Sequence, residues 1–480
     1  MTRRSQMPRF TRSLVLLAGA ALTLGACTTT TINYNGNGDA AAAEAEKPKA
    51  KNVILFIGDG MGVSTVTAAR IYAGQKLGQS GEEYVLPFEN FENVALVKTY
   101  NTDAQVPDSA GTATAMNSGQ KTRIGMLGIG PDAPRGDCVA GQQHHLPLMG
   151  EEAKKRGLAL GIVSTARITH ATPASVYARS VDRDWEAYIE GVEDQDAFGC
   201  RDIARQLVES DFDVALGGGT QAFYDSAKGG MRKEASADLP AQWVARTGGS
   251  YVTTAAELEA ASTDKPVLGL FSKSHMTYMV DRAESSTEPT LTEMTAQAVR
   301  RLENDPDGFY LMVESGRIDH GHHAGQAGYA LEEAVEFANA IRWAIENTDP
   351  DETLILVTAD HSHVFTMSGY PKRGNDILGL VVSPEALFGE GGEEPLLAGD
   401  GKPYTTLGYS NGPGAISGER AVPETGVKAR QQATVPLYSE THGGEDVAIY
   451  ANGPGAQKVR GVIEQDVIYS IIQAAYGWIE

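Results

Sequence analysis

The chain has 480 residues, of which 41% are hydrophobic and 21% are charged. That composition supports a large buried core, so it excludes a peptide, a collagen-like fibre and a mainly disordered chain. Forty Lys and Arg residues stand against 62 Asp and Glu residues, a net charge of -22, so the surface should repel polyanions. Nucleic acid is therefore not an expected partner.

The first 26 residues have the pattern of an export signal. Four arginines precede one apolar run, residues 13 to 26, which is too short to span a bilayer. The run ends in Leu-Gly-Ala immediately before Cys27, an arrangement that resembles a bacterial lipoprotein signal, in which this cysteine becomes the lipidated first residue. The alternative is a soluble exported protein in which Cys27 is incidental.

A polar segment, residues 27 to 50, follows the signal and offers little that could be buried, so we expect a flexible tether there. The sequence thus predicts an exported protein held by its lipid at a bacterial outer membrane. It does not distinguish the periplasmic face from the cell surface.

Cys138 and Cys200 are the only cysteines of the chain besides Cys27. An even pair in an oxidising compartment predicts a disulfide, with two free buried thiols as the alternative. Neither cysteine has a partner at Cys-x-x-Cys spacing, which disfavours a zinc site built from thiolates.

Short apolar runs alternate with helical patterns from residue 51 onward, which predicts an α/β fold with a mostly parallel central sheet covered by helices on both faces. Gly- and Pro-rich stretches near 216 to 250 and 385 to 428 are predicted as surface insertions on a single catalytic domain, residues 51 to 480. The apolar runs occupy 52 to 57, 158 to 164, 213 to 217, 266 to 271, 309 to 314 and 353 to 359, with amphipathic stretches at 289 to 304 and 327 to 347.

Three of these predicted strands end in side chains that can bind a metal: Asp59, Glu314 and the pair Asp360-His361. Ligands of open α/β sheets bind beyond the carboxyl ends of the strands, so we expect these side chains to meet. The loop 58 to 62 occupies the place of a dinucleotide-binding loop, but its third glycine is misplaced and Asp59 would repel a pyrophosphate. A metal-bridging carboxylate is the better interpretation, and a dinucleotide-dependent oxidoreductase is disfavoured.

Asp319 and His323 are four residues apart, which places them on one face if this segment is helical. A carboxylate and an imidazole one turn apart can bind one zinc ion. Five of the ten histidines lie between 320 and 363, a density that argues against scattered surface residues. Histidines of this group that are not ligands, such as His320, would orient the ligands.

Residues 106 to 115 have the pattern of a turn followed by a helix of small residues, with Ser109 in its first turn. The free N–H groups and the positive dipole at the N-terminus of a helix can stabilise either a bound phosphate or a serine alkoxide. The structural alternative is that Ser109 simply caps the helix.

Taken together, these motifs resemble those of the alkaline phosphatase family, most closely its animal-type branch. The resemblance covers residues 51 to about 478. The motifs that carry it are NVILFIGDGMG (52 to 62), PDSAGTATA (107 to 115), HATPASVYARSVDRDW (170 to 185), GFYLMVESGRIDHGHH (308 to 323), LVTADHSHVF (356 to 365) and ETHGGEDVAIYANGPGA (440 to 456).

The resemblance implies that Ser109 is a nucleophile that is transiently phosphorylated, and that Arg183 clamps phosphate oxygens. Asp108 either orients this arginine or interacts with the positive end of the helix dipole. His170 and His320 stand where some bacterial members carry an aspartate and a lysine near magnesium, so zinc could compete at that position. The implied ligands are Asp319, His323 and His442 for a first zinc, Asp59, Asp360 and His361 for a second zinc, and Asp59, Thr172 and Glu314 for magnesium.

The expected function is therefore hydrolysis of small phosphate monoesters, with broad specificity and an alkaline pH optimum. A phosphodiesterase or sulfatase of the same superfamily would share the metal scaffold, but the Cys/Ser-x-Pro-x-Arg signature of the sulfatase is missing at Ser109. A non-catalytic phosphate-binding lipoprotein would also suit the compartment, although none of the implied residues has been lost. Family members are commonly homodimers, so the expected oligomeric states are a homodimer and, as the alternative, a monomer.

Overall fold

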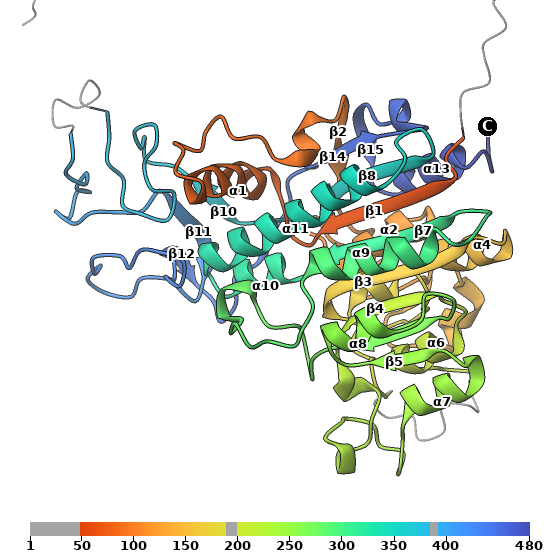
Figure 1. Cartoon of the computed structure of the whole chain (residues 1–480). Helices are drawn as coiled ribbons and strands as arrows, with labels where there is room; N and C mark the ends of the chain where they lie inside the picture. Colours follow the sequence, from red (N-terminus) through yellow and green to blue (C-terminus); the bar gives the residue numbers. More distant parts are fainter. Residues whose placement is uncertain (1–48, 189–198, 385–391) are drawn as a thin grey trace, which may run out of the picture. The chain divides into compact units, whose positions relative to one another are not determined.

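A single large sheet forms the centre of the protein in the computed structural model, which describes residues 49–188, 199–384 and 392–480 (Figure 1). Its ten strands lie in the order β15-β2-β14-β8-β1-β7-β3-β4-β6-β5. All pairings in this sheet are parallel except those of β14, which runs antiparallel to β8 and to β2. The strands are β1 (Asn52–Gly58), β2 (Asn93–Lys98), β3 (Ala159–Arg167), β4 (Val214–Gly218), β5 (Ser250–Val252), β6 (Val267–Leu270), β7 (Phe309–Ser315), β8 (Thr353–Ala359), β14 (Val447–Asn452) and β15 (Gly461–Glu464).

The central strands are buried along their whole length, which explains their continuous apolar sequences. Every residue of β1, β7 and β8 is buried. Strands that are covered on both faces cannot alternate between polar and apolar side chains. The predicted mostly parallel α/β sheet is confirmed.

Helices cover both faces of this sheet, as predicted. The two amphipathic stretches form α9 (Leu291–Leu302) and α11 (Ala327–Asn347), which lie on the face nearer the viewer in Figure 1, while α2 and α13 lie behind the sheet. Phe56 of β1 meets Phe337 of α11 edge to face, with ring centroids 5.9 Å apart. The other α-helices of the described residues are α1 (Val63–Lys76), α2 (Ser109–Ser118), α3 (Cys138–Gly141), α4 (Met149–Lys155), α5 (Ala171–Ala174), α6 (Ile203–Glu209), α7 (Leu239–Thr247), α8 (Ala255–Ala260), α10 (Arg317–His323) and α13 (Val467–Ala475).

Two smaller sheets stand beside the large one. The first contains β10 (Phe365–Met367), β11 (Leu407–Gly412) and β12 (Ala433–Pro436). The second pairs β9 (Ser362–His363) with β13 (His442–Gly443), so that His442 lies opposite His363. This short pairing brings the C-terminal part of the chain to the end of β8.

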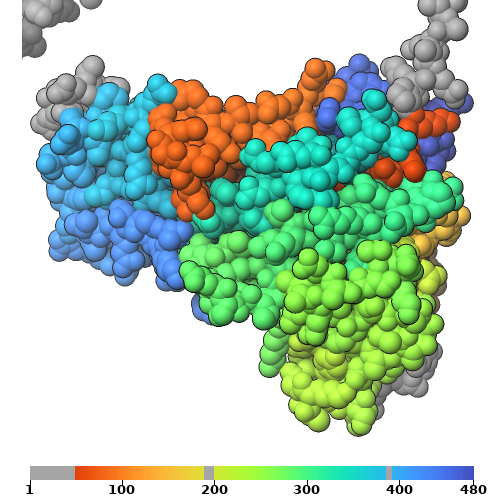
Figure 2. Space-filling model, viewed as in Figure 1, coloured from red at the N-terminus to blue at the C-terminus, as the bar shows by residue number. Residues whose placement is uncertain are grey.

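The two Gly- and Pro-rich stretches differ in structure. Residues 216 to 250 include the end of β4, α7 and the start of β5, so part of this stretch belongs to the large sheet. The described part of 385 to 428 is mostly irregular and contributes β11, and residues 385 to 391 lie outside the described residues. Figure 2 shows these segments on opposite sides of the core, yellow-green and blue respectively.

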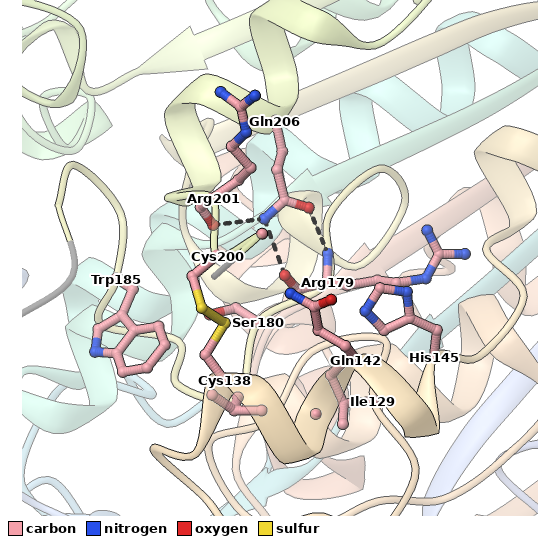
Figure 3. Close-up of a pocket in the computed structure, with 13 residues that line it drawn as sticks. Ile129, Cys138, Gln142, His145, Arg179, Ser180, Trp185, Cys200, Arg201 and Gln206 are labelled. Carbon is pink, nitrogen blue, oxygen red and sulfur yellow. Dashed lines mark hydrogen bonds between the residues drawn. A yellow bond between two sulfur atoms is a disulfide. The ribbon is translucent and has the colours of Figure 1, made fainter. Parts of the chain in front are cut away.

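Cys138 at the start of α3 is joined to Cys200, so the predicted disulfide is confirmed (Figure 3). Gln206 stabilises the same region, since its side chain accepts a hydrogen bond from the backbone N–H of Arg179 and donates to the carbonyls of Arg179 and Arg201.

Among the residues that the structure describes, no helix combines the length and the apolar character that crossing a membrane requires. The predicted signal, residues 1 to 26, and the predicted lipidation site, Cys27, lie outside the described residues.

Candidate active site

The site lies at the carboxyl ends of three neighbouring strands, β8, β1 and β7. Asp59 directly follows β1, Asp360 directly follows β8, and Glu314 is the last residue but one of β7. Gly58 at the end of β1 pairs with Ser315 on one side and with Ala359 on the other, so the three strands end at the same level. The sheet thus brings these predicted strand-end carboxylates together.

Asp59, Asp360 and His361 form a first fully buried group. The Nε2 atom of His361 lies 3.4 Å from Asp59 Oδ1 and 3.4 Å from Asp360 Oδ2. Both oxygens of Asp59 are buried without a hydrogen-bond donor from the described chain. Burial, followed by the nearby carboxylates of Asp360, Asp319 and Glu314, raises the pKa of Asp59 well above its ordinary value. A divalent cation would offset this charge, so the donor set fits a metal.

Asp319 and His323 form a second group on α10, which is helical as the spacing required. His323 Nε2 lies 3.3 Å from Asp319 Oδ1. His442 of β13 joins them, with its Nε2 atom 3.1 Å from His323 Nε2 and 3.4 Å from Asp319 Oδ1. The rings of His442 and His361 stack with centroids 3.6 Å apart, so the first and second groups are adjacent.

Asp59 also belongs to a third group, together with Glu314, His170 and Thr172. Ligand atoms of Asp59, His170 and Glu314 lie within 4.8 Å of one another. Burial raises the pKa of Glu314 to about 7, and its Oε1 atom is buried without a hydrogen-bond partner in the described part of the chain. Thr172 is fully buried in the first turn of α5, with its hydroxyl beside Glu314.

His320 lies beside this third group. Its ring is 5.7 Å from that of His170 and 4.0 Å from that of His275, measured between centroids. Burial lowers the pKa of His320 to about 3, so this imidazole is neutral. Of the two histidines predicted to lie beside the magnesium ligands, His170 therefore belongs to the third group itself and His320 lies next to it.

Ser109 is the first residue of α2 and is almost completely buried, with its Oγ atom 3.2 Å from His361 Nε2. The alternative that Ser109 caps the helix is wrong, because the cap is Asp108, whose carboxylate accepts a hydrogen bond from Gly111 N at 3.1 Å. The Ser109 hydroxyl is therefore available to the metal-binding groups.

Arg183 is held between two partners. Its Nη1 atom donates to Asp108 Oδ2 at 3.0 Å, and its Nη2 atom lies 3.1 Å from His170 Nε2. Although burial raises the pKa of Asp108, Arg183 and the N–H groups of Gly125 and Gly111 bring it below its ordinary value. A carboxylate and an arginine therefore stand as a fixed pair beside Ser109.

These groups surround one open pocket of about 300 Å³. Arg167 and Glu186 form part of its wall, joined by hydrogen bonds of 2.9 Å from Nε and 2.6 Å from Nη2 of the arginine. The predicted residues that line the pocket are Ser109, His170, Arg183, Asp319, His320, His323 and His442.

Three further residues hold the site: His363, which the sequence indicated as a member of the histidine cluster, and Glu440 and Ser164, to which no role was assigned from the sequence. His363 Nε2 lies 2.9 Å from Asp319 Oδ1, and its Nδ1 atom lies 2.6 Å from Glu440 Oε2. Burial lowers the pKa of His363, but the adjacent carboxylates of Asp319 and Glu440 outweigh burial and raise it to about 10. Ser164 donates to Glu314 from β3. The histidine cluster signalled His363, and Glu440 is the first residue of the motif at 440 to 456 but was given no role, whereas no motif signals Ser164.

The model of the alkaline phosphatase family matches residues 50–477. The chain belongs to the alkaline phosphatase family. It is 46% identical over 444 residues to the tissue-nonspecific alkaline phosphatase of Gallus gallus, covering 87% of this chain and 82% of the relative. An alkaline phosphatase of Gadus morhua is 44% identical over 441 residues, covering 87% and 90%.

Solved alkaline phosphatases share the fold. The enzyme of Thermus thermophilus superposes with a TM-score of 0.67 at 25% identity, over 90% of this chain and 92% of that one. The enzyme of the Antarctic bacterium TAB5 gives 0.63 at 24% identity, over 90% and 100%. This alkaline phosphatase is thus a metal-binding phosphoric monoester hydrolase, which favours the predicted function over the phosphodiesterase and non-catalytic alternatives.

Proposed function

We propose that Ser109 is the nucleophile of phosphomonoester hydrolysis and that Arg183 binds the phosphate group. The observation that carries this proposal is the position of the Ser109 hydroxyl, which lies 3.2 Å from His361 in a pocket that Arg183 also lines. Arg183 can present two N–H groups to two phosphate oxygens, a geometry that a lysine cannot reproduce. Asp108 orients the guanidinium through its 3.0 Å hydrogen bond.

The proposed reaction has two displacements. The bond from Ser109 Oγ to phosphorus forms as the bond from phosphorus to the alcohol oxygen breaks. The serine proton passes to solvent, and the leaving oxygen takes a proton from solvent and departs as the alcohol. Water then cleaves the phosphoserine and releases inorganic phosphate. Arg183 holds the phosphoryl oxygens through both displacements. The alkaline pH optimum and the broad specificity expected from the sequence belong to the same proposal.

We further propose three metal ions. Imidazole-rich sets suit zinc, whereas two carboxylates and a hydroxyl suit magnesium, which prefers oxygen ligands. When bound, the metals lower the pKa of hydroxyl groups in their reach and stabilise the negative charge of the phosphate. Zinc would be held by Asp319, His323 and His442 and by Asp59, Asp360 and His361, and magnesium by Asp59, Thr172 and Glu314.

The test of this proposal is the variant Ser109→Ala. We expect its turnover of a phosphomonoester to fall on the order of a thousandfold or more, because the nucleophile is lost. Its metal content should stay unchanged. The matched control is Ser118→Ala, which removes a buried hydroxyl at the other end of α2 and should keep its activity. Normal turnover by Ser109→Ala would overturn the assignment, as would faster turnover of a diester than of a monoester by the unmodified enzyme.

The N-terminal part is proposed as a signal peptide, 1 to 26, a lipid-bearing Cys27 and a tether to a single catalytic domain, 51 to 480. Surface insertions are proposed in the part of 216 to 250 that lies between β4 and β5, and near 385 to 428. One compact unit over Lys47–Glu480 supports the single domain. Incorporation of labelled fatty acid that is lost in Cys27→Ala would support the anchor, and labelling that persists in this variant would contradict it.

A homodimer is also proposed. It is supported by exposed apolar side chains at β12, an edge strand of the three-stranded sheet, because clustered apolar exposure marks interfaces. Tyr438 just beyond this strand is fully exposed, and Val435 and Leu437 are about half exposed. Light scattering of the purified protein distinguishes a dimer from a monomer.

A further inference from the structure

We infer that Asn101 is a positioning residue for phosphate binding, which acts through Asp108 on Arg183. This inference rests on the proposed role of Arg183 in binding phosphate. Asn101 is 3% exposed and lies outside the pocket, so it does not itself touch the substrate.

The hydrogen bonds of Asp108 carry the argument. Its Oδ1 atom accepts from Asn101 Nδ2 at 2.9 Å and from Gly111 N at 3.1 Å. Its Oδ2 atom accepts from Gly125 N at 3.0 Å and from Arg183 Nη1 at 3.0 Å. An ionised carboxylate has about four lone-pair sites, so four donors occupy it completely. The carboxylate cannot rotate without breaking one of these bonds, and the direction of Arg183 Nη1 is fixed with it.

Asn101 is itself held rigidly. Its backbone N–H donates to Ala104 O at 3.0 Å, and Ala104 N donates back to Asn101 O at 3.3 Å. Its side chain packs against α2 at Gly111, where an added Cβ atom would lie only 2.4 Å from Asn101 Oδ1. The amide therefore packs closely against α2 while it donates to Asp108.

The chemistry requires an amide at this position. Asn101 donates a neutral N–H to a carboxylate, whereas an aspartate of the same shape would place a second negative charge 2.9 Å away. Loss of the donor leaves Asp108 Oδ1 with Gly111 N alone, so the carboxylate and the arginine gain freedom to move.

The experiment measures inhibition by inorganic phosphate, together with KM, kcat and metal content, in the metal-loaded enzyme. We expect Asn101→Ala to weaken phosphate binding by about tenfold, as for the loss of one hydrogen bond to a charged group, and Asn101→Asp to weaken it further. In the Arg183→Ala background, either substitution should cause no additional weakening. The matched control is Asn52→Ala, since Asn52 is a buried amide at the opposite end of β1, and its phosphate inhibition should be unchanged.

The two proposals fail in different ways. Unchanged phosphate binding in Arg183→Ala would overturn the role of Arg183. Weak binding in Arg183→Ala, together with normal binding in both Asn101 variants, would overturn only the inference about Asn101. If the losses of phosphate binding caused by the Asn101 and Arg183 substitutions add in the double variants, the inference about Asn101 is also overturned, because Asn101 would then act independently of the arginine. Should Asn101→Ala fail to fold, Asn101→Asp preserves the shape of the side chain and gives the same comparison.

Discussion

Glu440 shows how a single buried residue can support several ligand positions. Its carboxylate holds His363, which contacts Asp319, and its backbone carbonyl lies 2.6 Å from His323 Nδ1. Groups that hydrogen-bond to metal ligands on the side away from the metal fix the orientation and basicity of those ligands. Glu440 should therefore influence metal affinity without contacting the metal.

We accordingly expect Glu440→Gln to bind zinc about ten- to a hundredfold more weakly, because the neutral amide is a weaker acceptor for His363. Retained zinc, measured after dialysis against graded chelator, checks this expectation. Glu332→Gln makes the same change at the surface of α11, beside Tyr72 and Lys76, and should retain its zinc. Equal retention by both variants would show that Glu440 has no such influence.

Individual site residues were predictable to different degrees. Asp59, Glu314 and Asp360 could be predicted because the ends of adjacent parallel strands share one edge of the sheet. Asn101 and Glu440 could not, because each contacts its partner through loops whose approach depends on the whole fold.

At the scale of elements, burial decides which strands the sequence predicts. β1 and β8 are buried throughout and appear as continuous apolar runs. β2 and β15 lie at one edge of the sheet and leave side chains such as Leu96 and Val462 exposed, so their patterns are broken and short. The pairing of β9 with β13 spans distant parts of the sequence and has no local signal.

Helix α11 carries a buried acid that should make stability depend on pH. Glu333 accepts a hydrogen bond from Met279 N at 2.6 Å, and burial raises its pKa from 4.5 to about 7. Between these values the folded protein binds more protons at Glu333 than the unfolded chain, so the free energy of unfolding falls as pH rises from 4.5 to 7.

Glu333→Gln removes this titration while keeping the shape of the side chain. We expect the variant to lose less stability than the unmodified enzyme between pH 5 and about pH 8, as followed by urea unfolding at constant metal concentration. If the free energy of unfolding depends on pH in the same way in both proteins, Glu333 does not cause the predicted pH dependence of stability.

At the scale of the whole molecule, the disulfide and the active site are separate features. The Cys138–Cys200 bond joins positions 62 residues apart and lines a different pocket from that of Ser109 and Arg183. Closing a loop of this length contributes about 4 kcal/mol in the chain-entropy model, chiefly by restricting the unfolded chain.

Replacement of both Cys138 and Cys200 by alanine should therefore lower the free energy of unfolding by about 4 kcal/mol while leaving kcat and metal content at 25 °C close to normal. Chemical unfolding and assays of the same preparations test both parts. Unchanged stability would contradict the first part, and selective loss of kcat in a folded variant would contradict the separation of the two features.

The most direct test of the whole account is to trap the covalent intermediate. The metal-loaded enzyme would be mixed with a phosphomonoester, quenched in acid within a turnover, digested and analysed by mass spectrometry. We predict one phosphate on the peptide that contains Ser109, localised to that hydroxyl, and none on this peptide in Ser109→Ala. Phosphate on another residue, or trapping that persists in the alanine variant, would contradict the central claim.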